Sequence, residues 1–292
     1  MFEMKKAIIV SNILDPLSRN VEDLKEVYPR LFESGRYDAI ENRPVRGEEL
    51  IPFFNEIRPA EVTTTYYITG DLARAGLSLS GTDEANRRQA VEICKKELLA
   101  ADKTNCTYLG IGSGAIEENT LKNLDQFVRS LSEIFDFMRE KGLKTRLSIE
   151  PLDQYAHKKN VIGSLDMTLR LLRKLEKRGY GTAEFILTWD AAHVALNEDD
   201  FEESIRKLAK YIYKVHFANA VLDKEDALYG DRHLNFEKGF MNQEVARNIL
   251  AYCKNYIDHP IEVACEIRET EREHCWILEE ETYRFLKKVM EE

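Results

Sequence analysis

Short apolar runs alternate with amphipathic stretches along the whole chain. The run at residues 7–10 is typical of a buried strand, and in residues 21–33 the side chains of Leu24, Val27 and Leu31 recur at helical spacing. The same pattern continues to the C-terminus. The predicted strands are residues 7–10, 37–41, 62–68, 106–109, 147–150, 185–190, 213–216 and 261–266, and the predicted helices are residues 21–33, 47–57, 83–101, 121–141, 164–178, 201–209, 243–256 and 279–289.

Eight strand-then-helix units predict an α/β fold with a parallel sheet, and eight is the number that closes into a (β/α)8 TIM barrel. A doubly wound open sheet also alternates, so the count leaves both folds open. The 14 glycines and 7 prolines form no linker. Residues 1–292 are therefore predicted to form a single domain, with residues 70–81 as a loop.

The fifth to eighth predicted strands each end on a polar side chain that can bind a metal. Glu150 is followed at once by a proline, which stops a strand, and Asp190, His216 and Glu266 end three later strands. Barrel enzymes place their chemistry at the C-terminal ends of several strands, whereas an open sheet gathers its ligands at one switch point. The distribution favours the barrel.

Three carboxylates and one imidazole suit a hard or borderline divalent ion such as Mn²⁺, Mg²⁺, Co²⁺ or Zn²⁺. Taken singly, each side chain has a structural alternative as a helix cap or a hydrogen-bonded core residue. Together, four such groups at one barrel mouth would leave uncompensated buried charge without a cation. Glu150, Asp190, His216 and Glu266 are therefore predicted to bind one catalytic metal ion.

A second group of polar residues follows these strands. His193 comes three residues after Asp190 and can project to the same side, toward a metal-bound ligand. The loop at residues 230–239 holds Asp231, Arg232 and His233, and the arginine fork can bind two oxygens of a polyol or a phosphate. A solvated charged loop is the alternative. The glycine-rich residues 110–114 could cradle a phosphate or could simply form a turn.

Composition excludes several classes of protein. A formal net charge of −10 argues against nucleic-acid binding, which relies on clustered Lys and Arg. Residues 1–6 lack the pattern of a secretory signal, and no apolar run approaches the roughly 20 residues that span a bilayer. A cytoplasmic protein without membrane partners is expected. The five cysteines form no Cys-x-x-Cys pair and are interpreted as reduced packing residues.

The polar motifs resemble those of a known superfamily. In order and spacing they are similar to motifs of the xylose isomerase-like TIM barrels, which are sugar isomerases and epimerases and include D-tagatose 3-epimerase. The motifs that carry the resemblance are Glu150-Pro-Leu, Asp190-x-x-His193, Val215-His216, Asp231-Arg-His and the strand-end Glu266.

The resemblance implies a set of roles. One divalent ion, most often Mn²⁺ or Co²⁺, would be bound by the two glutamates together with Asp190 and His216. Glu150 and Glu266 would also exchange protons with the substrate from opposite faces. His193 and Arg232 would contact the substrate, with Asp231 and His233 beside them. A homo-oligomer, dimer or tetramer, is expected from the resemblance alone.

The leading prediction is a metal-dependent isomerase or epimerase that interconverts ketoses, aldoses or related polyols through a metal-stabilised enediolate. The alternatives are a dehydratase or lyase of the inositol type and a non-catalytic sugar-binding barrel. An apurinic-endonuclease-like hydrolase is a further alternative, because Asp231-x-His233 also matches zinc ligands of that branch. Its three-zinc site takes two histidines from the third and fourth strands, and residues 63–67 and 108–111 contain none.

Overall fold

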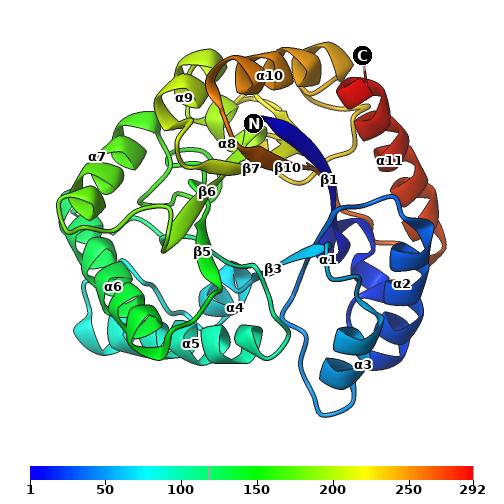
Figure 1. Cartoon of the computed structure of the whole chain (residues 1–292). Helices are drawn as coiled ribbons and strands as arrows, with labels where there is room; N and C mark the ends of the chain where they lie inside the picture. The colour runs from blue at the N-terminus through cyan, green and yellow to red at the C-terminus, as the bar shows by residue number, and fades with distance from the viewer. Residues whose placement is uncertain (118, 292) are drawn as a thin grey trace.

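The computed structural model describes residues 1–117 and 119–291. Eight parallel strands close into a barrel in the order β1-β10-β7-β6-β5-β4-β3-β2, and helices surround it (Figure 1), which confirms the predicted fold. The barrel strands are β1 (Glu3–Ile9), β2 (Ala39–Asn42), β3 (Thr63–Tyr67), β4 (Tyr108–Ile111), β5 (Arg146–Ile149), β6 (Phe185–Asp190), β7 (Ile212–Ala218) and β10 (Pro260–Glu266). The helices are α1 (Val10–Ile13), α2 (Val21–Ser34), α3 (Leu50–Ile57), α4 (Thr69–Arg74), α5 (Glu84–Asp102), α6 (Thr120–Lys141), α7 (Leu165–Glu176), α8 (Ala191–Leu196), α9 (Phe201–Leu208), α10 (Gln243–Tyr256) and α11 (Cys275–Glu291).

Helix α6 shows how local sequence sets the limits of an element. The side chain of Asn119 accepts a hydrogen bond of 3.0 Å from the backbone N–H of Lys122 and so caps the first turn. Gly142 ends the helix with a φ of 64°, a left-handed conformation that glycine adopts without strain. Between these ends, one face of the helix packs on the core through Leu124, Phe127 and Leu131.

Three features of the loops differ from the sequence-based expectation. The segment 70–81 was expected to be a loop, but it begins with α4, which is too short for helical periodicity to show. Helix α8 starts directly after β6, and the loop after β7 contains a small antiparallel hairpin of β8 (Ala220–Val221) and β9 (Gly230–Asp231). All three lie on the side where the barrel strands end, and they shape the mouth.

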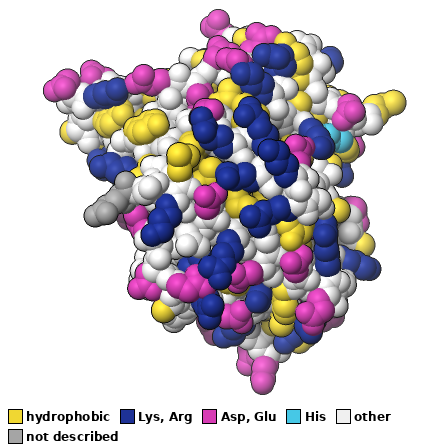
Figure 2. All heavy atoms as spheres, turned by 90° about the vertical axis from the view of Figure 1, so that its left-hand side faces the viewer, with side chains coloured by type: hydrophobic (Ala, Val, Ile, Leu, Met, Phe, Trp, Pro, Cys, Tyr) yellow, Lys and Arg dark blue, Asp and Glu magenta, His cyan; other side chains and the backbone are white. Residues whose placement is uncertain are grey.

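The outer surface carries charged side chains of both signs, interspersed over the face that Figure 2 presents. Among the described helices, none is both long and apolar enough to span a bilayer. All five cysteines are buried and unpaired, as expected for packing residues.

Candidate functional site

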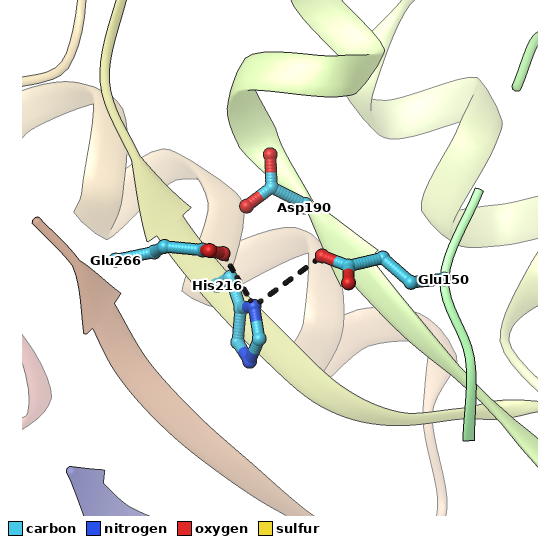
Figure 3. A group of neighbouring side chains, drawn as sticks. All are labelled: Glu150, Asp190, His216 and Glu266. Carbon is cyan, nitrogen blue, oxygen red and sulfur yellow. Dashed lines mark hydrogen bonds and ion pairs between the residues drawn. The ribbon is translucent and has the colours of Figure 1, made fainter. Parts of the chain in front are cut away.

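Four side chains converge at the C-terminal mouth of the barrel. Asp190 and His216 are register partners on β6 and β7, Glu266 ends β10, and Glu150 follows β5. One ligand atom of each residue lies within 4.8 Å of the ligand atoms of the others. Figure 3 shows the four side chains pointing toward one another. We call Glu150, Asp190, His216 and Glu266 the metal quartet.

The buried carboxylates of the quartet would be stabilised by a cation. Burial, together with the carboxylates of Glu266 and Glu150, raises the pKa of Asp190 well above its usual range. Its Oδ1 accepts a bond of 3.0 Å from the N–H of His193, but among the described residues no donor reaches the buried Oδ2. An orphaned carboxylate oxygen that faces two further carboxylates fits a divalent ion, which would take the place of the proton on Asp190.

The ring of His216 is held between carboxylates on both of its nitrogens. Nδ1 lies 2.9 Å from Oε2 of Glu266 and 3.6 Å from Oε1 of Glu150. Nε2 lies 3.1 Å from Oε2 of Glu41, a buried residue of β2. Burial opposes charge on the ring, but Glu41 and the two quartet glutamates outweigh it and raise the pKa of His216 well above its usual range. Glu41 therefore fixes the ring with Nδ1 toward the other ligands.

Beneath the quartet, an ion network fills the barrel interior. The ammonium of Lys214 is fully buried and pairs with Glu41 at 2.9 Å and with Glu262. Glu262 also accepts a hydrogen bond from the hydroxyl of Thr63 on β3. Burial raises the pKa of Glu41, but Lys214 and His216 outweigh it and lower the pKa, so the network supplies Glu41 to His216 as a charged partner.

The second predicted group lies beside the quartet. His193 packs at the start of α8, where Nδ1 accepts a hydrogen bond of 3.1 Å from the N–H of Asp153 and Nε2 lies 3.8 Å from Asp231. Nδ1 of His233 is 3.4 Å from Oε1 of Glu266. Asp231 pairs with the ammonium of Lys158 at 3.0 Å, so a charge on this carboxylate is already balanced by a side chain.

Arg232 is placed differently from its three predicted neighbours. It is exposed and lies outside the main cavity, and its Nε is 3.5 Å from the carbonyl oxygen of Tyr229. It lines a smaller cavity next to the mouth. The wall of the main cavity contains Arg268 instead, two residues after Glu266, together with Arg43 and Arg74.

The main cavity has a volume of about 610 Å³ and opens over the quartet. Its wall contains polar side chains, and the segment around α4 adds apolar ones. The polar residues are Glu150, His193, His216, Asp231, His233 and Glu266. The apolar residues are Leu72, Ala73, Leu77 and Leu79. A concave site with an apolar wall and a few convergent polar groups is typical of a small-molecule site.

Gly110 allows close packing against the ring of Tyr67. A Cβ atom at this position would lie 2.2 Å from Cδ1 of Tyr67. The Tyr67 ring lines the cavity, and its centroid is 6.2 Å from that of His216. The missing side chain at Gly110 therefore makes room for a ring that borders the quartet.

Sequence analysis did not select Glu41, Arg268 or Lys158. Glu41 is near the end of the second strand, so the rule that selected four other strand ends also applies to it. Arg268 lies two residues after Glu266, and positions i and i+2 of an extended chain face the same side. Lys158 lies in an irregular loop and carries no comparable signal.

Comparison with known proteins agrees with this architecture. The family model described as xylose isomerase-like TIM barrel matches residues 33–281. No curated protein matches the chain in sequence.

Several solved structures share the fold. A D-tagatose 3-epimerase-like protein is 18% identical with a TM-score of 0.70, covering 99% of both chains. An L-ribulose 3-epimerase is 14% identical with a TM-score of 0.73, covering 99% of this chain and 95% of its own. The IOLI protein with a bound zinc atom is 14% identical with a TM-score of 0.63, covering 98% and 96%. At these identities the shared feature is the fold.

Proposed function

The chain belongs to the xylose isomerase-like TIM barrel family, and we propose that it is a divalent-metal-dependent sugar isomerase or epimerase. The substrate would be a ketose, an aldose or a related polyol, and the reaction a proton transfer next to its carbonyl. The observation that carries this proposal is the metal quartet, which includes two glutamates and three of whose members line the main cavity.

The quartet residues would hold the ion. Their oxygen and nitrogen donors suit Mn²⁺ or Co²⁺ and differ from the sulfur-rich shells of structural zinc. When bound, a divalent ion supplies a positive charge that stabilises negative charge on the substrate's carbonyl and neighbouring hydroxyl oxygens. Lys214 and Glu41 contribute by holding His216 in one orientation.

Glu266 is suited to remove a proton from carbon. Burial alone would raise the pKa of Glu266, but the hydrogen bond with His216 and the nearby His233 lower it to about 2, so the carboxylate is ionised at neutral pH. Glu150 approaches the same nitrogen of His216 from another strand. Two carboxylates on different sides of one substrate would allow a proton to leave one face and return on the other, which is the requirement for epimerisation.

His193, Asp231 and His233 would orient the substrate hydroxyls. Since Nδ1 of His193 accepts the backbone hydrogen bond from Asp153, the ring proton of the neutral form is on Nε2, toward Asp231. Burial lowers the pKa of His193, but the carboxylates of Asp190, Asp153 and Asp231 outweigh it and raise the pKa to about 10. Nε2 therefore keeps its proton at neutral pH and is a suitable donor to a sugar oxygen.

Proton exchange tests the proposal directly. The Mn²⁺-loaded chain is incubated in deuterated water with a panel of ketoses and aldoses, and deuterium at the carbon next to the carbonyl is measured by NMR. We expect incorporation in at least one sugar and a loss of about 100-fold or more in Glu266→Gln, with folding and metal content retained. Glu269→Gln is the matched control, because Glu269 lies three residues after Glu266 and accepts hydrogen bonds from the backbone N–H groups of Thr270 and Glu271.

Other outcomes of this assay separate the alternatives. Loss of water from the substrate would identify a dehydratase or lyase on the same platform. Binding of sugar without exchange or water loss would identify a non-catalytic barrel. Normal exchange in Glu266→Gln would remove Glu266 from the acid/base role.

A further inference from the structure

Arg268 is a cation in the cavity wall without a carboxylate partner among the described residues. The other three lysine and arginine residues that line the cavity each form an ion pair. These pairs are Arg43 with Asp15, Arg74 with Asp71, and Lys158 with Asp231. Arg268 is exposed, and its guanidinium, which pairs with no acid among the described residues, is available to a ligand at the cavity wall.

The backbone around Arg268 is fixed at both sides. Its N–H donates to the carbonyl oxygen of His233 at 3.0 Å, and the N–H of Glu269 donates to the carbonyl oxygen of Asn12 at 3.1 Å. These bonds tie the chain beyond β10 to the loop after β9 and to α1. The guanidinium therefore projects from an anchored segment.

A single side chain connects the guanidinium to the acid/base carboxylate. An Nη atom of Arg268 lies 3.4 Å from Oδ1 of Asn12, and Nδ2 of Asn12 donates to Oε1 of Glu266 at 3.1 Å. The side-chain amide of Asn12 thus links the guanidinium of Arg268 to Glu266 of the metal quartet. A ligand group on the guanidinium and a reacting carbon near Glu266 can belong to one small molecule.

Lys158 is a second cation in the wall of the same cavity as Arg268. Only Lys158 of these two cations has a carboxylate partner. An anion in this part of the cavity would be attracted by both, although the chain as a whole carries a net charge of −10.

We propose that the substrate carries an anionic group, a phosphate ester or a carboxylate, and that Arg268 binds this group while the substrate's carbonyl lies at the metal quartet. The position of the carbonyl at the metal quartet rests on the proposed function. The fork of a guanidinium binds two oxygens of either anion at once. The cavity volume of about 610 Å³ leaves space for such a substituent beside the sugar.

Equilibrium binding tests the proposal without requiring turnover. Isothermal titration calorimetry on the Mn²⁺-loaded chain compares three probes with one carbon skeleton: D-fructose, D-fructose 6-phosphate, and D-fructuronate, whose terminal carbon is a carboxylate. We expect at least one anionic probe to bind about 10–100-fold tighter than D-fructose, the range of a hydrogen bond to a charged group. The tighter of the two identifies the anion.

Two variants assign the preference to Arg268. Arg268→Met should remove most of the preference for the anionic probe and leave D-fructose binding within about twofold, while Arg268→Lys should keep part of it. Arg232→Met is the matched control, because Arg232 is exposed and lies outside the cavity. It should bind all three probes like the unmodified chain.

Several results would overturn the proposal. Equal affinity for all three probes, no binding of either anion, or a preference that persists in Arg268→Met would each show that Arg268 does not select an anion. The result of the proton-exchange assay does not depend on the result of this binding assay. Absence of exchange would reject the isomerase function, while the affinity ratio of the probes would still decide the anion site.

Discussion

Glu41 offers the sharpest test of how the barrel interior controls the metal quartet. Its carboxylate is fully buried and lies 3.1 Å from Nε2 of His216, on the side of the ring opposite to Glu150 and Glu266. The change Glu41→Gln keeps the shape of the side chain and removes its charge. The quartet itself is untouched, so any change in metal affinity must pass through His216.

The structure sets the expected magnitude. Burial raises the pKa of Glu41, but the neighbouring Lys214 ammonium and His216 outweigh it and lower the pKa to about 2. Glu41 is therefore a charged acceptor at neutral pH, and a hydrogen bond to a charged group contributes about 1.5–3 kcal/mol. Losing a carboxylate that orients a histidine ligand should weaken Mn²⁺ binding about 10–100-fold.

Glu262→Gln is the matched control. Glu262 pairs with the same buried ammonium of Lys214 but makes no contact with His216. Both variants neutralise one of the two carboxylates around Lys214, and we expect similar losses in the free energy of unfolding. Only Glu41→Gln should lose Mn²⁺ affinity, measured from free Mn²⁺ by electron paramagnetic resonance. Equal Mn²⁺ affinity in the two variants, whether both are weakened or both are unchanged, would refute this reasoning.

Three further predictions concern packing and protons. Gly110→Ala should cost about 1–3 kcal/mol of stability in chemical denaturation, because the added Cβ would overlap the Tyr67 ring, whereas Gly181→Ala, with no neighbour within 4 Å, should stay within about 0.5 kcal/mol. Arg87→Ala should cost about 2–3 kcal/mol, because its fully buried guanidinium joins Glu84, Ser130 and Glu133 across α5 and α6; Arg88→Ala, an exposed partner of the same Glu84, should have little effect. Mn²⁺ affinity should rise about tenfold or more from pH 6 to pH 7. The pKa values of Asp190 and His216 are raised, so protons compete with the ion for these ligands, and this competition weakens as the pH rises. A calorimetric titration that shows no pH dependence would contradict this.

The barrel itself was predictable from sequence for a physical reason. A parallel sheet buried on both faces needs short apolar strands such as Phe185–Asp190, and each return crossover needs an amphipathic helix, so the chain alternates visibly. The polar residues at strand ends stand out against this background, and the structure brings the four predicted quartet residues within 4.8 Å of one another. Their binding of a metal remains a prediction.

The same reasoning explains why Lys214 and Glu41 were harder to find. A lysine in a strand is ordinarily read as solvent-facing, and the second strand had only a weak apolar pattern. Lys214 is fully buried because Glu41 and Glu262 converge on it from two other strands. Such pairing depends on the register of strands that are far apart in sequence, which composition and periodicity do not specify.

Arg232 and Arg268 show the same limit in the loops. Arg232 was predicted to contact the substrate because its loop follows the seventh strand and because of the family resemblance. The structure leaves Arg232 exposed outside the main cavity, whereas Asp231 and His233 line that cavity. Arg268 follows Glu266 by two positions and faces the cavity with it. Alternation counted from a strand-end carboxylate therefore finds the arginine that lines the cavity, whereas the sequence of an irregular loop does not show which of its side chains turn inward.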